Sequence, residues 1–139
     1  MQVAIAGQVV TLASLEWEPY IGPNMDNNGY VYEIVDEAFK RSGINVDIRF
    51  LPWARAVKTA QTGKRDGLFP EYYDEGRLKD FVFSESFPGG PVGLYKRKDN
   101  KVKFESDPQK NQTEALKALK QYRFGVVRDY INTKEFDEA

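Results

Sequence analysis

The chain has 139 residues, of which 41% are hydrophobic and 29% charged, with a formal net charge of −1. This composition is typical of one globular domain or slightly more, has no apolar run long enough to span a bilayer, and argues against nucleic acid as a partner. The chain has no Cys and no His, which excludes disulfides, thiolate metal sites and histidine-based catalysis, so no metal or cofactor is expected.

The first half of the chain alternates between predicted strands and predicted helices. Short β-branched and apolar runs predict strands at residues 9–15, 46–50 and 66–70. Apolar spacings of three and four residues predict helices at residues 30–42 and 52–63. This β-α-β-α-β order predicts the α/β fold class, with a mostly parallel sheet and flanking helices.

The second half is more polar and its elements are shorter. Residues 71–79 are expected to form a loop or one helical turn, and the charged run at 96–101 is interpreted as a solvated linker. Apolar segments predict strands at residues 81–84, 92–95 and 123–127. Helices are expected at residues 113–120 and from residue 133 onward.

The first six residues allow more than one interpretation. Ala4-Ile5-Ala6 has the small-x-small form of a signal-peptidase site, but the charged and apolar regions of a signal peptide are missing before it. Residues 1–6 are therefore the remnant of a signal peptide, residues added by cloning, or the plain start of the first strand.

Several segments together resemble a known family. Three of them lie in the first half: the strand with its aromatic, proline-containing loop at 12–20, the run Gly29-Tyr30-Val31-Tyr32-Glu33-Ile34, and the helix followed by an Asp-Gly strand at 53–67. The others are Asp74-Glu75-Gly76-Arg77, Phe83-Ser84-Glu85-Ser86-Phe87, and the strand and loop of 123–130. Their order over nearly the whole chain is similar to that of the family 3 solute-binding proteins of bacterial ABC transporters. The resemblance implies a periplasmic-binding-protein-like fold of type II, with residues 1–97 as lobe one and 98–139 as the crossover and an incomplete lobe two.

The sequence departs from the family pattern where the family holds a ligand carboxylate. Arg77 matches the family's Arg, whose planar guanidinium suits a carboxylate. Asp74 stands where the family has Thr, and Val31 stands at an often acidic position. The resemblance by itself implies an amino acid or a similar molecule as the ligand, whereas an acid at position 74 argues against an α-amino acid, because it would repel an anion or neutralise Arg77.

The candidate site residues follow the predicted strands. Ligands of open α/β sheets bind beyond the carboxyl ends of the strands, which here predicts a cleft near residues 15, 51 and 70. The predicted ligand-binding residues are Trp17, Tyr20, Trp53, Glu71, Tyr72, Arg77 and, from the second lobe, Arg128 with Asp129 and Tyr130 beside it. In the alternative interpretation the two Trp side chains pack on the core and Arg77 forms an ion pair with Asp74 or Glu75, while Arg55 is solvated.

Function follows from the resemblance and from the aromatic content of 14%, which favours binding over catalysis. The resemblance implies a periplasmic or otherwise extracytoplasmic protein that captures a small polar solute, an amino acid or a similar molecule, and presents it to the permease of an ABC uptake transporter. Two alternatives stay open: a dehydratase-like enzyme that uses Glu16, Glu18 and Glu71, and the ligand-sensing domain of a receptor. The incomplete second lobe also predicts a homodimer that exchanges its C-terminal segment.

Overall fold

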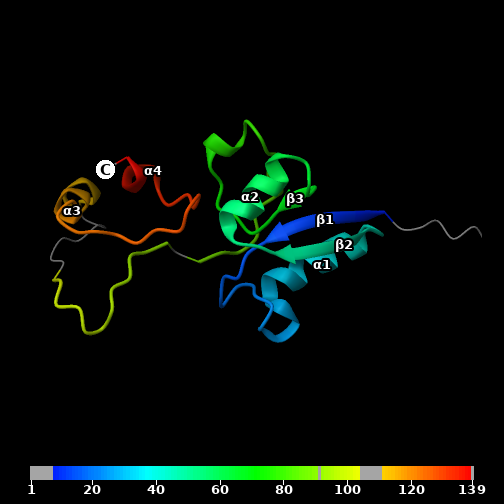
Figure 1. Ribbon diagram of the computed structural model, residues 1–139, viewed down its shortest axis with the longest axis horizontal. Coiled ribbons are helices and arrows are strands. Elements are labelled where there is room, and N and C mark those ends of the chain that lie inside the picture. Colours follow the sequence, from blue (N-terminus) through cyan, green and yellow to red (C-terminus); the bar gives the residue numbers. More distant parts are fainter. Residues whose placement is uncertain (1–7, 91, 104–110, 139) are drawn as a thin grey trace, which may run out of the picture. The chain divides into compact units, whose positions relative to one another are not determined.

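The structure is a computed structural model that describes residues 8–90, 92–103 and 111–138 (Figure 1). These residues form two compact units. The first contains the described residues up to Val82 together with Val127–Asp129, and the second contains the described residues of Phe83–Val126 and Tyr130–Ala139. Among the described residues, no helix has both the length and the apolar character needed to cross a membrane.

A three-stranded parallel sheet forms the centre of the first unit. Strands β1 (Val9–Ser14), β2 (Asn45–Phe50) and β3 (Gly67–Leu68) lie in the order β2-β1-β3. Along β1, Val9 lies opposite Asn45 and Ser14 opposite Phe50, whereas β3 pairs only with Leu12 and Ala13. The sheet confirms the predicted parallel arrangement, although β3 is shorter than the predicted strand at 66–70.

Two helices flank this sheet on opposite faces (Figure 1). Helix α1 (Tyr30–Arg41) buries only Val31, and Ile34 on its expected apolar face stays 39% exposed. Helix α2 (Trp53–Gln61) buries Trp53, Ala56 and Val57, whose spacing places them on one face. The buried apolar side chains of the first unit are Leu12, Ala13, Leu15, Ile21, Val31, Trp53, Ala56, Val57 and Phe69.

Helix α1 ends at Arg41, close to the predicted end at residue 42, and Gly43 follows its last turn. Gly43 has a φ of 73°, and its N–H donates to the Lys40 carbonyl at 2.9 Å. The Ile44 N–H donates to the Phe39 carbonyl at 3.0 Å, so two carbonyl groups of the last turn are satisfied. Short 3₁₀ turns occur at η1 (Asp26–Asn28) and η2 (Glu75–Arg77).

The second unit contains two short helices. Asn111 accepts a hydrogen bond from the Glu114 N–H at the start of α3 (Gln112–Leu119), and Thr133 accepts one from the Phe136 N–H at the start of α4 (Lys134–Asp137). Phe136 also packs edge-on against Phe124, with ring centroids 5.5 Å apart. Both helices confirm the predictions for this region.

The three strands predicted for the second half are wrong. Residues 81–84, 92–95 and 123–127 are described, but none of them is part of a strand. Val82 is 97% and Tyr95 95% exposed, so their apolar side chains are not buried against a sheet face. An apolar, β-branched composition forms a strand only when a neighbouring strand completes the hydrogen-bond ladder.

Asp66 links the start of β3 to β1 through hydrogen bonds with Thr11. Its Oδ2 atom accepts a hydrogen bond from the Thr11 hydroxyl at 2.7 Å and one from the Thr11 N–H at 2.8 Å. The Asp66 N–H in turn donates to the Thr11 carbonyl at 2.8 Å. The bonds from the Thr11 hydroxyl and N–H lower the pKa of Asp66, because they stabilise the ionised carboxylate.

We expect Asp66→Asn to lower the stability of the protein at neutral pH and to have less effect in acid. Because the folded-state pKa of Asp66 is depressed, the contribution of its carboxylate is present above the unfolded-state pKa of about 4. That contribution is lost as the pH falls through the lower folded-state pKa. Urea unfolding of both proteins between neutral and acidic pH measures the difference.

The matched control for this experiment is Asp36→Asn. Asp36 pairs with Lys40 on the surface of α1, where the Lys40 side chain is 60% exposed, so its loss should matter little. Equal losses for the two variants at neutral pH, or an Asp66→Asn effect that persists unchanged in acid, would contradict the role given to Asp66.

Candidate functional site

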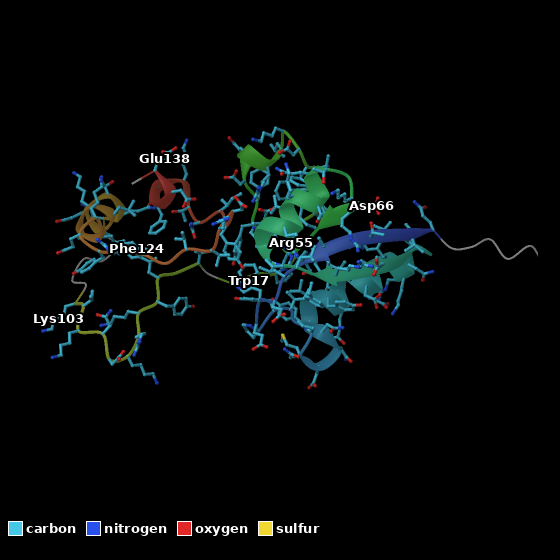
Figure 2. All side chains as sticks on the ribbon, viewed as in Figure 1. Trp17, Arg55, Asp66, Lys103, Phe124 and Glu138 are labelled. Atoms are coloured by element: carbon cyan, nitrogen blue, oxygen red, sulfur yellow. The ribbon has the colours of Figure 1, made fainter. Side chains whose placement is uncertain are left out.

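The candidate site lies at the carboxyl edge of the sheet. Because the three strands are parallel, the segments that follow Ser14, Phe50 and Leu68 emerge at the same edge. Figure 2 shows Trp17 beyond this end of β1 and Asp66 toward the opposite end of the sheet. We use "carboxyl edge" for the segments 15–22, 51–53 and 69–77.

The segment after β1 is held in a tight bridge. The Trp17 N–H donates to the Ile21 carbonyl at 2.7 Å, and the Ile21 N–H donates to the Trp17 carbonyl at 3.1 Å. Ile21 is completely buried, and the Tyr20 carbonyl accepts a hydrogen bond from the Val31 N–H at 3.2 Å. The backbone that carries Trp17 and Tyr20 is therefore fixed against the core and the first turn of α1.

Gly29 makes this close packing possible. A Cβ atom at position 29 would lie 2.6 Å from the Tyr20 carbonyl oxygen and 2.9 Å from the Ile21 Cα. The residue also has a φ of 92°, which side-chain-bearing residues rarely adopt. The glycine that opens the aromatic run quoted above is thus required by both contact and conformation.

Four aromatic rings meet at the carboxyl edge, and we call them the aromatic cluster. Ring centroids are 5.3 Å apart for Trp17 and Tyr20, 5.8 Å for Trp17 and Tyr72, and 6.0 Å for Tyr20 and Tyr30, all in edge-to-face geometry. Burial raises the pKa of Tyr72, with smaller contributions from Tyr20 and Tyr30, so its hydroxyl stays protonated at neutral pH. The adjacent Tyr73 is 63% exposed.

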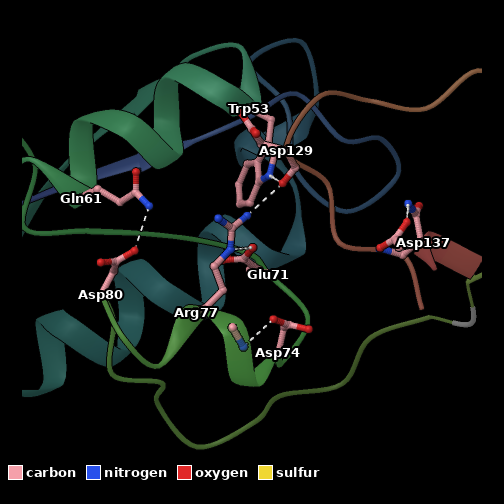
Figure 3. Close-up of polar contacts among 10 residues, drawn as sticks. Trp53, Gln61, Glu71, Asp74, Arg77, Asp80, Asp129 and Asp137 are labelled. Atoms are coloured by element: carbon pink, nitrogen blue, oxygen red, sulfur yellow. Dashed lines mark hydrogen bonds and ion pairs between the residues drawn. The ribbon is translucent and has the colours of Figure 1, made fainter. Parts of the chain in front are cut away.

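A second group, the polar cluster, consists of Trp53, Glu71, Arg77 and the main-chain carbonyl of Asp129 (Figure 3). Arg77 Nε donates to Glu71 Oε1 at 2.9 Å, and Arg77 Nη2 donates to the Asp129 carbonyl at 2.9 Å. Trp53 Nε1 donates to the same carbonyl, also at 2.9 Å. The side chains of Arg77 and Glu71 are only 13% and 11% exposed, so their ion pair is largely shielded from water.

The pairing of Arg77 differs from the expected one. The alternative interpretation gave it Asp74 or Glu75 as partner, but Arg77 pairs with Glu71. Asp74 instead accepts a hydrogen bond from the Gly76 N–H at 2.7 Å and caps the η2 turn. An acid three residues before the Arg is used locally by the turn, which leaves the guanidinium free to reach across to the segment after β3.

Burial and the neighbouring Arg77 act in opposite directions on the pKa of Glu71. Burial raises the pKa of Glu71 above its usual value, and the adjacent Arg77 opposes that rise through its charge and its hydrogen bond. The nearby Asp74 adds a smaller contribution that raises the pKa further. The 2.9 Å contact with Arg77 Nε places the Glu71 carboxylate, as the anion of the ion pair, directly beside the guanidinium.

The structure brings most, but not all, of the predicted site residues into these two clusters. Trp17, Tyr20 and Tyr72 belong to the aromatic cluster, and Trp53, Glu71 and Arg77 to the polar cluster. Four of the charged side chains considered from the sequence are exposed and join neither cluster: Glu16, Glu18, Arg55 and Arg128. Among the described residues, no three acidic side chains gather into a group that could hold a metal ion.

Two contributions to the site do not follow from the predicted side chains. Tyr30 joins the aromatic cluster, although its place in the Gly-aromatic run at the start of a helix did not make it a candidate site residue. Its position directly after the crowded Gly29 was the available signal. Asp129 was expected to face the site, but its contribution is a main-chain carbonyl, which side-chain patterns cannot reveal.

A parallel sheet with aromatic side chains and buried charge-assisted donors at its carboxyl edge is typical of an α/β ligand-binding protein. The chain belongs to the bacterial extracellular solute-binding proteins, family 3, which it matches over residues 9–130. This match confirms the type II periplasmic-binding fold and the general role of an extracellular solute-binding protein. No curated protein and no solved structure matches the chain.

Proposed function

We propose that the protein captures a small polar solute at the carboxyl edge of its sheet and presents it to the permease of an ABC uptake transporter in the periplasm. The observation that carries this proposal is the convergence of the Arg77 and Trp53 donors beside a shielded ion pair. Buried, charge-assisted donors are the groups by which binding sites orient polar ligands.

The aromatic cluster supplies the apolar part of the proposed site. Trp17 and Tyr72 present rigid ring surfaces, which contribute contact area at little cost in conformational entropy. Tyr20 and Tyr30 support these rings from the side of α1. In this proposal Arg128 contributes an exposed charge to the solute from the segment next to Asp129.

A binding role fits the carboxylates better than the dehydratase-like alternative does. General acid–base catalysis needs a proton donor and acceptor within reach of the substrate. Glu16 and Glu18 are exposed, and Glu71 is held by Arg77 at 2.9 Å. We therefore propose no catalytic role for any of the three.

Native mass spectrometry of the protein, purified after secretion into a bacterial periplasm, tests the proposed function. We expect a population that carries one small polar molecule, released on gentle collisional activation. Protein unfolded, dialysed and refolded serves as the solute-free control. Two negative results together would contradict solute capture: the protein carries no adduct, and no solute in a panel of polar molecules raises its melting temperature.

We also propose that two copies exchange their C-terminal segments. The supporting observation is the exposure of Val126 and Val127, at 60% and 52%, in a segment that forms neither helix nor strand and that two identical chains could pair. Light scattering measures the mass in solution. A monomer at all accessible concentrations would contradict the exchange.

A further inference from the structure

Two donors in the polar cluster converge on one oxygen atom. Arg77 Nη2 and Trp53 Nε1 both lie 2.9 Å from the carbonyl oxygen of Asp129 (Figure 3). A carbonyl oxygen has two lone pairs and accepts two such hydrogen bonds with good geometry. The pair of N–H groups therefore forms a site shaped for one acceptor oxygen.

Both donors are held in place by the fold. Trp53 is the first residue of α2 and is 6% exposed, so the core fixes its indole ring. Arg77 is the last residue of η2, and its Nε bond to Glu71 orients the guanidinium plane. Preorganised donors of this kind lose little conformational entropy when an acceptor binds.

The surroundings of the two donors favour an uncharged acceptor. Glu71 lies 2.9 Å from Arg77 Nε, and the two shielded side chains together carry no net charge. A carboxylate placed on Arg77 Nη2 would face the negative charge of Glu71 and, beyond it, that of Asp74, without a second cation in the polar cluster. The acceptor that the chain itself places there is an amide carbonyl, which is uncharged.

We propose that Arg77 Nη2 and Trp53 Nε1 bind the uncharged carbonyl oxygen of an amide-type solute, and that the Asp129 carbonyl holds this place until the solute displaces it. The proposal rests on the proposed function and names the chemical class of its solute. Asp129 has a φ of 64°. A non-glycine residue is strained in this region, so release of the Asp129 segment relieves backbone strain and favours displacement of its carbonyl by the solute.

Two matched probes test the proposal by nuclear magnetic resonance. N-acetylglycinamide is uncharged and carries two amide carbonyls, whereas N-acetylglycine has the same skeleton with a carboxylate. We expect N-acetylglycinamide to shift the Trp53 indole N–H and the Asp129 carbonyl ¹³C resonances, with an affinity about tenfold higher than that of N-acetylglycine at neutral pH.

The variant Glu71→Gln changes the charge but not the shape of the site. It leaves the Arg77 charge uncompensated, so the preference for N-acetylglycinamide over N-acetylglycine should fall by about tenfold or reverse. Glu75→Gln is the matched control, since Glu75 is exposed in the same η2 turn and should leave the preference unchanged. If Glu71→Gln fails to fold, the two probes on the unmodified protein decide alone.

Each outcome separates this proposal from the proposed function. Equal or tighter binding of N-acetylglycine by the unmodified protein, or unmoved Trp53 and Asp129 resonances up to the solubility limit of both probes, would overturn the amide preference. If the co-purified solute still binds in that case, solute capture stands and only the solute class is wrong. If no solute binds in any assay, the proposed function fails as well.

Discussion

Replacing Gly29 by alanine is expected to destabilise the protein by about 3 kcal/mol. The new Cβ would lie 2.6 Å from the Tyr20 carbonyl oxygen and 2.9 Å from the Ile21 Cα, both parts of the backbone that cannot rotate away. Alanine would also have to adopt a φ near 92°. To relieve the contact, the segment 15–22 must move away from α1, which breaks the Val31 N–H bond to Tyr20.

The variant Gly43→Ala separates the cost of the close contact from the cost of the positive φ. Gly43 has a φ of 73°, but nothing lies within 4 Å of its would-be Cβ, so only the conformational strain of about 1 kcal/mol applies. Urea unfolding followed by tryptophan fluorescence gives both free energies. If the two variants lose the same stability, the close approach of Gly29 to Tyr20 does not control the position of the Trp17 loop.

Arg77→Ala is expected to weaken solute binding by about 2–5 kcal/mol, whereas Arg55→Ala should change it by less than about 0.5 kcal/mol. Arg77 is 13% exposed and donates to both Glu71 and the oxygen position now held by Asp129. Its removal leaves the Glu71 carboxylate shielded from water without its cation. Arg55 is exposed on α2 and serves as the matched control.

Calorimetry with the solute that co-purifies with the protein compares the two arginine variants. Arg77→Lys is a useful third protein, because a single ammonium group cannot reproduce the two separate N–H directions of the guanidinium. We expect it to bind nearly as weakly as Arg77→Ala. Equal affinities for Arg77→Ala and Arg55→Ala would show that the Arg77–Glu71 pair is only structural.

The sheet and its helices were predictable because local pattern and tertiary structure agree. The alternation of Val46, Ile48 and Phe50 with polar residues matches the half-exposed strand β2. The helix predicted at residues 52–63 matches α2, although Ala56, and not Ala54, joins Trp53 and Val57 on its buried face. Parallel strands then require that the segments carrying Trp17, Trp53 and Tyr72 emerge at one edge, so most of the candidate site followed from the element order.

The remaining features depend on contacts that sequence patterns do not encode. The predicted strands at 81–84, 92–95 and 123–127 have suitable compositions, but a strand also needs a paired neighbour. The sequence predicts an acidic partner for Arg77 within three residues, whereas its partner Glu71 lies six residues before it, because η2 turns the guanidinium back toward Glu71. The Asp129 carbonyl is 52 residues from Arg77 and carries no side-chain signal.

Hydrogen–deuterium exchange, measured with and without the co-purified solute, tests the location of the binding site most directly. We predict that the solute slows exchange in the segments 15–22, 51–53 and 69–77 of the carboxyl edge. The opposite ends of the strands, near Val9, Asn45 and Asp66, should be unaffected and provide the internal control. Protection centred on those amino ends, or no protection at the carboxyl edge under saturating solute, would contradict solute binding at this edge of the sheet.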